Sequence, residues 1–319
     1  MKDLFISIIV PTRNEEKNLP RLFQSLRQLN YPKDKLELII VDGGSTDQTV
    51  TLAKNFGAKV LSNTRKIRGA GCKIGVAKAK GQLVAFTDAD CVVPKNWLKD
   101  LLPFFNQKEV ASVGGPNVTP KDDTPFAKAA GEVVTLLTRP GSRYGYQGHQ
   151  VTEIYHNPGC NVLYLKKAIL KVGNFNPRLL TCEDEELDFR LLQAGYRLLF
   201  TPQVVVDHYR RPTYKKIFIQ AYRFAIGRVQ AGKLHPQMFK WFHFLPSLGL
   251  LGLVAAVGSL FSHFRIWGIY FLAASFLVFL AASFYLALTK KNQPFYVYLK
   301  IIGCWFFGWA WGFLTGLIS

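Results

Sequence analysis

The feature that most constrains this chain is the near absence of charge from its last third. Within residues 241–289 the only charged side chain is Arg265, and within residues 294–319 it is Lys300. Three apolar stretches occupy this region, at approximately residues 244–262, 266–288 and 294–318. Each reaches the roughly 20 residues that cross a hydrocarbon core. Buried helices of a soluble protein are the alternative, but three stretches almost back to back favour about three transmembrane helices.

Positive charge is concentrated directly beside these apolar stretches. Eight Lys or Arg residues and one acid lie in residues 207–240, and Lys290 and Lys291 separate the second stretch from the third. Short loops rich in Lys and Arg stay on the cytoplasmic side of a membrane. We therefore expect a multi-pass protein of the cell (plasma) membrane, with its N-terminal domain and the Lys290 turn in the cytoplasm and the Arg265 turn outside.

The formal net charge of +19 would also suit a nucleic-acid-binding protein. Its concentration next to the apolar stretches favours a membrane partner instead, and we expect no nucleic acid partner. Residues 211–240 are basic and aromatic, with apolar side chains near helical spacing, which predicts amphipathic helices in the membrane interface. Such a segment attracts anionic lipid head groups and can also receive a lipid phosphate.

Residues 1–210 have the pattern of a separate α/β domain. Apolar runs alternate with amphipathic helical segments four times in about 90 residues, with the runs at residues 5–10, 36–41, 58–61 and 83–87. This alternation predicts right-handed βαβ units and a parallel sheet. The five cysteines have no CxxC spacing, which favours reduced thiols over a disulfide framework or a zinc site.

Polar side chains follow the predicted strands. Asn14 follows the first strand, Asp42 ends the second, and Asp88 and Asp90 follow the fourth. Carboxyl ends of strands in open α/β sheets are where ligands bind. Two carboxylates two residues apart can serve a hard divalent cation together with a hydroxyl-bearing ligand. An ordinary Asx turn after the strand is the alternative.

Five short segments occur in a particular order. They are Pro-Thr-Arg-Asn-Glu at 11–15, Val-Asp-Gly-Gly-Ser-Thr-Asp at 41–47, Asp-Ala-Asp at 88–90, Cys-Glu-Asp-Glu-Glu-Leu at 182–187 and Gln-Ala-Tyr-Arg-Phe at 220–224. With these segments the sequence resembles family 2 glycosyltransferases of the GT-A fold, over roughly residues 5–230. The resemblance implies a Rossmann-like mixed sheet and an inverting transfer from a nucleoside diphosphate sugar with Mn²⁺ or Mg²⁺. A UDP-sugar is favoured, and GDP-mannose is possible.

The resemblance also implies roles for the acids after the strands. Asp90 contacts the metal directly, and Asp88 contacts the nucleotide or reaches the metal through water. Asp42 accepts hydrogen bonds from the base; its alternative is a cap for the next helix, which Asp47 can also provide. His208 ligates the metal or contacts the diphosphate, although a lone histidine is more often structural.

Further residues of the nucleotide site follow from the same resemblance. They are Pro11, Thr12, Asn14 and Glu15, with helix capping as the alternative for Thr12 and Asn14. Lys73 lies in a glycine-containing segment that is basic in the family, and it either approaches phosphate or lies on a solvated helix face. Ile74 departs from the family pattern there, since an Asn is expected.

Catalysis is expected from the helix that begins near residue 183. The resemblance makes Asp184 the base that deprotonates the acceptor hydroxyl and Glu183 a residue that positions acceptor or sugar. Acids in a first helical turn also stabilise the helix dipole without any catalytic role. Gln220 and Arg223 resemble the QxxRW signature, with Arg223 stabilising the leaving diphosphate. Phe224 replaces the Trp of that signature, which weakens a processive reading.

The sequence therefore predicts a cytoplasmic GT-A catalytic domain at residues 1–210, basic interfacial helices at 211–240 and a transmembrane region at 241–319. We expect a membrane-anchored enzyme that moves one sugar to a lipid-linked or polyprenyl phosphate acceptor in glycan assembly. A phosphate acceptor would need no base. The alternatives are a processive polysaccharide synthase and a catalytically inactive membrane protein that binds sugar nucleotides.

Overall fold

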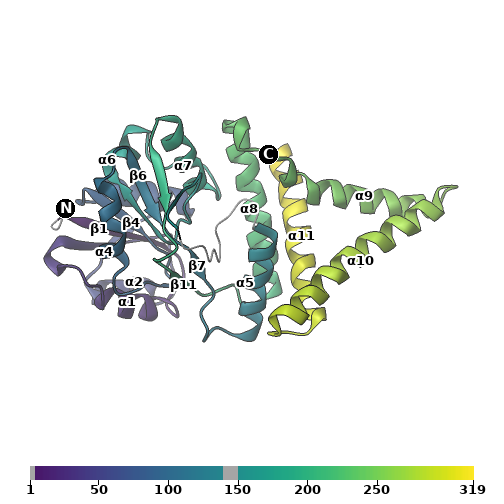
Figure 1. Cartoon of the computed structure of the whole chain (residues 1–319), viewed down its shortest axis with the longest axis horizontal. Helices are drawn as coiled ribbons and strands as arrows, with labels where there is room; N and C mark the ends of the chain where they lie inside the picture. The colour runs from purple at the N-terminus through teal and green to yellow at the C-terminus, as the bar shows by residue number, and fades with distance from the viewer. Residues whose placement is uncertain (1–3, 139–149) are drawn as a thin grey trace. The chain divides into compact units, whose positions relative to one another are not determined.

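In the computed structural model of the chain, which describes residues 4–138 and 150–319, the alternating segments build an eight-stranded mixed sheet (Figure 1). Its strands are β1 (Ile6–Thr12), β2 (Leu36–Asp42), β3 (Lys59–Ser62), β4 (Leu83–Phe86), β6 (Val110–Gly114), β8 (Thr152–Glu153), β9 (Val162–Leu165) and β10 (Arg197–Phe200). The order is β3-β2-β1-β4-β9-β6-β10-β8. The first four strands in this order are parallel, and β9 runs antiparallel to both β4 and β6. The α/β class and the mixed sheet are confirmed.

Helices cover both faces of this sheet because successive strand residues point to opposite sides. One core joins Ile8 and Val10 of β1 to buried residues of α1, α2 and α4, and the other joins Ile9 to residues of α3, α6 and α7. The helices are α1 (Leu19–Arg27), α2 (Thr49–Phe56), α3 (Arg68–Lys78), α4 (Trp97–Leu101), α6 (Lys166–Lys171) and α7 (Glu183–Gln193).

The strand register brings the predicted polar residues to one edge. Thr12 of β1 pairs with Asp42 of β2, and Ile9 of β1 pairs with Phe86, the last residue of β4. The carboxyl ends of these three parallel strands therefore meet at the same edge of the sheet. This edge is where the sequence predicts a ligand site.

A second sheet has three strands, and the first of them follows β4 in the chain. Its strands are β5 (Cys91–Val92), β7 (Asn117–Val118) and β11 (Val206–His208), in the order β5-β11-β7. β11 runs antiparallel to β5, and His208 pairs with Cys91. The pairing brings His208 next to Asp90, which precedes Cys91 in the chain.

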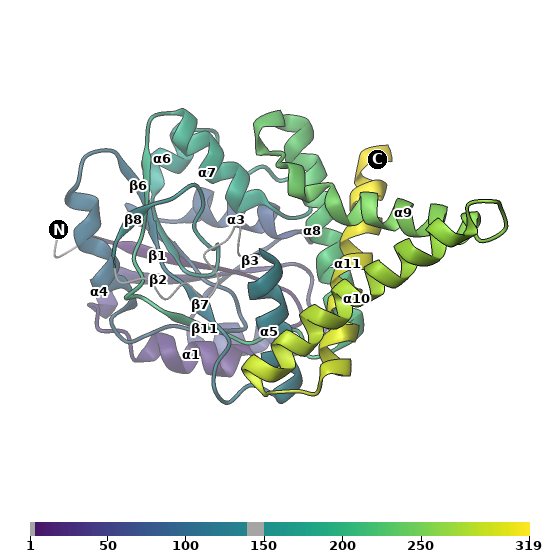
Figure 2. The same cartoon turned by 45° about the vertical axis from the view of Figure 1, so that its right-hand side comes forward.

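The chain divides into two compact units, Met1–Pro120 with Thr138–Tyr209, and Lys121–Leu137 with Arg210–Ser319. The second unit is helical, with α5 (Pro125–Thr138), α8 (Tyr214–Leu234), α9 (Leu245–Ser259), α10 (Arg265–Lys290) and α11 (Phe295–Ile318). Within it α9 and α10 meet at the turn of residues 260–264, which projects away from α11 in both views (Figures 1 and 2). Buried residues of α5, α8 and α11 form one apolar core, which includes Val133, Ile217 and Ile301.

Among the described residues, two helices are long and apolar enough to cross a membrane, α10 and α11. They have 26 and 24 residues, so they extend about 39 Å and 36 Å, longer than a hydrocarbon core of about 30 Å. The first predicted stretch instead forms α9, whose 15 residues extend only about 22 Å. The expected count of about three spans is not confirmed.

Candidate active site

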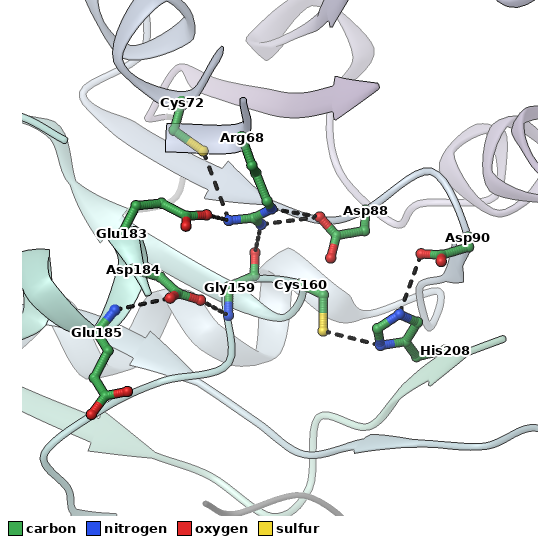
Figure 3. Close-up of polar contacts among 10 residues, drawn as sticks. All are labelled: Arg68, Cys72, Asp88, Asp90, Gly159, Cys160, Glu183, Asp184, Glu185 and His208. Atoms are coloured by element: carbon green, nitrogen blue, oxygen red, sulfur yellow. Dashed lines mark hydrogen bonds and ion pairs between the residues drawn. The ribbon is translucent and has the colours of Figure 1, made fainter. Parts of the chain in front are cut away.

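Arg68, the first residue of α3, lies at the centre of an acidic cluster at the carboxyl edge (Figure 3). Its Nε and Nη2 donate to Asp88 Oδ1 at 3.1 and 3.0 Å, and its Nη1 donates to Glu183 Oε1 at 2.6 Å. Nη2 also donates to the Gly159 carbonyl at 2.9 Å. One guanidinium thus joins the exit of β4, the start of α7 and the loop before β9.

The charged groups in this cluster shift one another's pKa values. Burial acts to lower the pKa of Arg68, but the negative charges, Asp88 first among them, raise that pKa well above its ordinary value, so the guanidinium stays charged. Burial raises the pKa of Glu183, although the pairing with Arg68 opposes this shift. The cluster therefore holds one permanent cation against two carboxylates, one of which is almost fully buried.

Asp184 is oriented by backbone groups. Its Oδ2 accepts a hydrogen bond from the Gly159 N–H at 3.1 Å, and its Oδ1 accepts one from the Glu185 N–H at 2.9 Å. A Cβ at position 159 would lie 2.5 Å from Asp184 Oδ2, so any larger residue there would displace this carboxylate. Asp184 is only partly buried. The result is an accessible carboxylate with a fixed orientation at the N-terminus of α7.

Asp88, Asp90 and His208 form a candidate metal centre. Each offers one ligand atom, and the three atoms all lie within 4.8 Å of one another. His208 Nε2 lies 3.3 Å from Asp90 Oδ1. Carboxylate oxygens, which two of the three residues supply, suit Mg²⁺ or Mn²⁺. The donor set therefore fits the cation that the family resemblance implies.

Two free, buried cysteines lie beside this centre. Cys160 Sγ is 3.7 Å from His208 Nδ1, and Cys91 lies close to both residues. Interaction with the Cys91 thiol, together with His208, lowers the pKa of Cys160 to about 6 although burial opposes the shift. The motif-based reasoning did not include either cysteine in the site.

The exit turn of β2 is built differently. Asp42 accepts from the Gly44 N–H at 3.0 Å, and from the Ser45 N–H and hydroxyl at 3.1 and 2.5 Å. Asp47 accepts from the N–H groups of Thr49 and Glu16 at 3.0 and 3.1 Å. Burial acts to raise the pKa of Asp47, but these hydrogen bonds lower it overall. The structure thus gives both carboxylates a structural contact, and the base contact of Asp42 stays a prediction.

The segment after β1 is held by hydrogen bonds to the exit turn of β2 and the start of α2. Asn14 has a positive φ of 56°, and its Oδ1 accepts from the Thr46 N–H at 2.9 Å. The Glu15 N–H donates to Thr49 Oγ1 at 2.7 Å, and its carboxylate accepts from Asn18 at 2.6 Å. Thr12 Oγ1 is buried and has no hydrogen-bond partner among the described residues. Thr12 and Pro11 end β1, so the unsatisfied hydroxyl lies at the ligand edge.

Three further predicted residues belong to α3 and α8. Lys73 is exposed on α3, five residues after Arg68. Gln220 and Arg223 lie on α8 in the second unit, where Arg223 is exposed. Their roles stay predictions.

Arg68 is the residue that sequence reasoning missed. The family resemblance points to the glycine-containing segment that holds both Arg68 and Lys73, but it favours Lys73 as the functional cation. A signal was present in Gly69: a Cβ there would lie 2.9 Å from the Asn176 carbonyl and 3.0 Å from Glu183 Cβ. A glycine directly after Arg68 therefore lets the start of α3 approach α7.

Sequence reasoning also missed a buried network behind Asp184. Asp188, on the same helix, accepts from Tyr164 Oη at 2.8 Å and from the Asn157 N–H at 2.9 Å, and it pairs with His156 Nδ1 at 3.0 Å. Burial raises the pKa of Asp188. Burial acts to lower the pKa of His156, but Asp184 and Asp188 raise it to about 9. His156 is therefore a cation at neutral pH.

Comparisons with known proteins agree with this architecture. A sequence profile described as glycosyl transferase family 2 matches residues 7–173, more than half of the chain. Glycosyltransferase AglE of Haloferax volcanii is 26% identical over 236 residues, which cover 72% of this chain and 75% of the relative. The dolichyl N-acetyl-alpha-D-glucosaminyl phosphate 3-beta-D-2,3-diacetamido-2,3-dideoxy-beta-D-glucuronosyltransferase of Methanococcus voltae is 25% identical over 238 residues, which cover 70% and 73%.

A solved structure extends the similarity to nearly the whole chain. It is a mannosyltransferase from Pyrobaculum calidifontis in complex with GDP-Man and Mn²⁺, with a TM-score of 0.61 over 98% of this chain and 87% of that chain. At 18% identity this likeness establishes the fold alone. The strand order, the two faces of helices and the matched profile lead to one conclusion: the chain belongs to glycosyl transferase family 2 and has a GT-A fold.

Proposed function

We propose that this protein is a membrane-anchored, inverting glycosyltransferase that moves one sugar from a nucleoside diphosphate sugar to a lipid-linked or polyprenyl phosphate acceptor. The observation that carries the proposal is the convergence of Asp88, Asp90 and His208 at one edge of the sheet, beside the oriented carboxylate of Asp184. Residues 1–210 would be the cytoplasmic catalytic domain, 211–240 the interfacial helices and 241–319 the transmembrane region.

Donor binding is assigned to the carboxyl edge of β1, β2 and β4. Asp88, Asp90 and His208 would hold Mn²⁺ or Mg²⁺, which when bound neutralises the charge that grows on the leaving diphosphate. The base and ribose would lie near the ends of β1 and β2, in a pocket formed by Pro11, Thr12, Asn14, Glu15 and Asp42. The unsatisfied hydroxyl of Thr12 supports this assignment.

Structures of similar fold support a nucleotide donor without choosing the base. The Pyrobaculum calidifontis mannosyltransferase is described with GDP-Man and Mn²⁺, and Staphylococcus aureus TarS residues 1–349 are described with UDP, at a TM-score of 0.52. We favour a UDP-sugar and retain GDP-mannose as the second candidate. Lys73, Gln220 and Arg223 are proposed to approach the diphosphate.

Arg68 is assigned a different role from the phosphate-binding cations. Its guanidinium donates to Asp88 and to Glu183, so its charge is already compensated by two acids. We assign it to holding Asp88 at the metal centre and Glu183 beside Asp184. Donor and acceptor sides of the reaction are thereby fixed relative to each other.

Transfer to a hydroxyl requires a base, and Asp184 has the orientation for that role. The acceptor oxygen forms a bond to the anomeric carbon as the bond from that carbon to the diphosphate oxygen breaks. The hydroxyl proton passes to the Asp184 carboxylate, and the nucleoside diphosphate leaves. Attack from the side opposite the leaving group inverts the anomeric centre. An acceptor phosphate is already an anion, and Asp184 would then only orient it.

The second unit supports an acceptor that is held in a lipid bilayer. Large apolar side chains on α10 are exposed, among them Trp267, Val278 and Leu288, and exposed apolar surface of this extent marks a membrane or protein interface. Basic residues precede these helices in the chain. The name of the Methanococcus voltae relative contains a dolichyl N-acetyl-alpha-D-glucosaminyl phosphate, which is a lipid-linked sugar. Phe224 in place of Trp favours a single transfer over processive synthesis.

A transfer assay with matched variants tests this proposal. The full chain in detergent is supplied with Mn²⁺, a panel of UDP- and GDP-sugars, and either a polyprenyl phosphate or a lipid-linked saccharide. We expect release of nucleoside diphosphate that depends on the acceptor. Asp184→Asn should lower transfer to a hydroxyl acceptor by about a hundredfold to ten-thousandfold while donor affinity is retained.

The matched control is Glu185→Gln, which removes a charge from the same helical turn and should keep the rate within about threefold. Undiminished transfer to a hydroxyl acceptor by Asp184→Asn would contradict the assignment of the base. Absence of nucleotide release with every donor would contradict the proposed activity itself.

A further inference from the structure

A second set of metal-binding groups lies against the carboxylate centre. One ligand atom from each of Cys91, Cys160 and His208 lies within 4.8 Å of the other two. The three residues come from separate parts of the fold: Cys91 begins β5, Cys160 precedes β9 and His208 ends β11. Both thiols are free, and their side chains are almost fully buried.

We propose that Cys91, Cys160 and the Nδ1 atom of His208 form a thiolate site for a zinc-class cation, separate from the carboxylate centre. Tetrahedral Zn²⁺ with Zn–S of about 2.3 Å and Zn–N of about 2.0 Å places sulfur and nitrogen about 3.5 Å apart. Cys160 Sγ and His208 Nδ1 are 3.7 Å apart. The pair already has the spacing that such an ion requires, and a fourth position stays open for water.

The orientation of the His208 ring separates the two sites. Nδ1 faces Cys160, whereas Nε2 faces Asp90 at 3.3 Å (Figure 3). An ion on Nδ1 leaves a proton on Nε2, which can donate to Asp90. A carboxylate that accepts from the second nitrogen of a metal-bound histidine is a common arrangement in zinc sites.

The two sites exclude each other through this one ring. A neutral imidazole has a single nitrogen with a free lone pair, so it can ligate one cation at a time. A cation on Nε2 with the two carboxylates requires the proton on Nδ1, where Cys160 can accept it. A cation on Nδ1 with the two sulfurs requires the proton on Nε2. Occupation of the thiolate site therefore removes His208 from the carboxylate centre.

Ligand chemistry decides which cation takes which site. Thiolates favour zinc-class ions, whereas carboxylates favour Mg²⁺ and Mn²⁺. The entering ion replaces the thiol protons of Cys91 and Cys160, and both protons leave to solvent. The predicted consequence is inhibition by Zn²⁺ of an enzyme that uses Mn²⁺ or Mg²⁺.

Spacing along the chain argued against any zinc site, because the cysteines form no CxxC pair. That argument covers ligands that are close in sequence. Here the β11–β5 pairing places His208 opposite Cys91, and the loop before β9 adds Cys160. The donor set exists only in the folded chain.

Cadmium binding tests the thiolate site directly. Cd²⁺ is titrated into the reduced, detergent-purified full chain, and thiolate-to-cadmium charge-transfer absorption is recorded. We expect a band that saturates near one equivalent and is lost in Cys91→Ser and in Cys160→Ser. It should persist in Cys182→Ser, which removes a cysteine that is not a proposed ligand, and in Asp90→Asn. Absence of the band in the wild type, or its persistence in both ligand variants, would overturn the proposal.

Cys91→Ser and Cys160→Ser change buried residues, so a second measurement uses the wild type alone and does not depend on the folding of these variants. X-ray absorption of the chain loaded with one equivalent of Zn²⁺ should show two sulfur ligands at about 2.3 Å. A first shell of nitrogen and oxygen alone would overturn the site.

Competition between Zn²⁺ and Mn²⁺ tests whether the two sites exclude each other. Of the experiments on the thiolate site, this one alone rests on the proposed function. Zn²⁺ should inhibit Mn²⁺-supported transfer, and the Zn²⁺ concentration that halves the activity should rise about tenfold or more in Cys91→Ser, since a lost ligand typically costs at least that factor. Simultaneous, independent binding of Mn²⁺ and Cd²⁺ would refute the exclusion. Transfer that proceeds without any divalent cation would refute the metal role in the proposed function, and the cadmium titration would still decide the thiolate site.

Discussion

The exit turns of β2 and β4 look alike in the sequence and differ in the structure. Each follows a buried strand of the same sheet edge, and each carries an aspartate with a predicted ligand role. At β2, Asp42 accepts hydrogen bonds from the residues directly after it, Gly44 and Ser45. At β4, Asp88 and Asp90 are contacted by Arg68 and His208, which come from other elements.

This difference separates a local turn from an assembled site. The Asp42 contacts can form with only the next three residues in place, so they stabilise the turn whatever binds there. The contacts of Asp88 and Asp90 require the sheet, α3 and β11 together. Charges brought together in this way cost free energy unless they are compensated, and their retention fits a ligand role.

The largest effect on stability is expected when the cation that compensates the Asp88 and Glu183 charges is removed. Arg68→Met should lower the free energy of unfolding by about 3 to 5 kcal/mol, because it leaves the Asp88 and buried Glu183 carboxylates without their shared cation. The matched control is Arg197→Met, which breaks the more exposed ion pair with Glu153 and should cost less than about 1 kcal/mol. Denaturant unfolding of both variants measures the difference. Equal losses would show that Arg68 is an ordinary surface cation.

A pH dependence of intermediate size is expected from His156. Its pKa is raised from 6.5 to about 9, chiefly by Asp184 and Asp188 against the effect of burial, so the folded chain keeps a proton that the unfolded chain loses. The resulting stabilisation is complete below about pH 6.5 and is lost as the pH rises through about 9. Its size is on the order of 3 kcal/mol.

Thermal unfolding of the wild type and of His156→Gln measures the stabilisation by protonated His156. The two are compared between about pH 6 and about pH 9.5, the range in which this proton is lost. The wild type should lose its advantage over the variant as the pH rises. A difference that is constant with pH would mean that His156 is neutral in the fold.

The smallest effect is expected at the β2 turn. Asp42→Ala and Asp47→Ala should each cost about 1 kcal/mol, since each removes a carboxylate that accepts from neighbouring backbone N–H groups. Donor affinity, measured by calorimetry, should also fall by about tenfold in Asp42→Ala, because this carboxylate is proposed to line the donor pocket. Unchanged donor affinity would remove Asp42 from that pocket and leave it a purely structural residue of the turn.

The strands and helices of the first unit were predictable because their patterns are local. β1, β2 and β4 are largely apolar runs, and α7 begins at residue 183, where the sequence predicts a helix. Asp88, Asp90 and Asp184 could be singled out because each lies in a short family motif. The position of Asp88 and Asp90 at the sheet edge followed from the βαβ pattern.

The site residues that the sequence analysis did not identify are far apart in the chain from the residues that they contact. Arg68 is 20 residues from Asp88 and 115 from Glu183, and neither separation leaves a pattern that a local reading can detect. Cys91 and Cys160 meet His208 only through strand pairing. The span count is not confirmed for another reason: composition gives the length of an apolar stretch, but the helical part of residues 244–262 is only α9.

The most direct test of the contrast between the two turns is Mn²⁺ binding by matched isosteric variants. The wild type, Asp90→Asn and Asp42→Asn are titrated with Mn²⁺ in the presence of a nucleoside diphosphate, and free Mn²⁺ is followed by electron paramagnetic resonance. The account predicts that Asp42→Asn binds like the wild type, whereas Asp90→Asn binds about a hundredfold more weakly, which corresponds to about 2.7 kcal/mol. Unchanged affinity in Asp90→Asn together with lost binding in Asp42→Asn would contradict it.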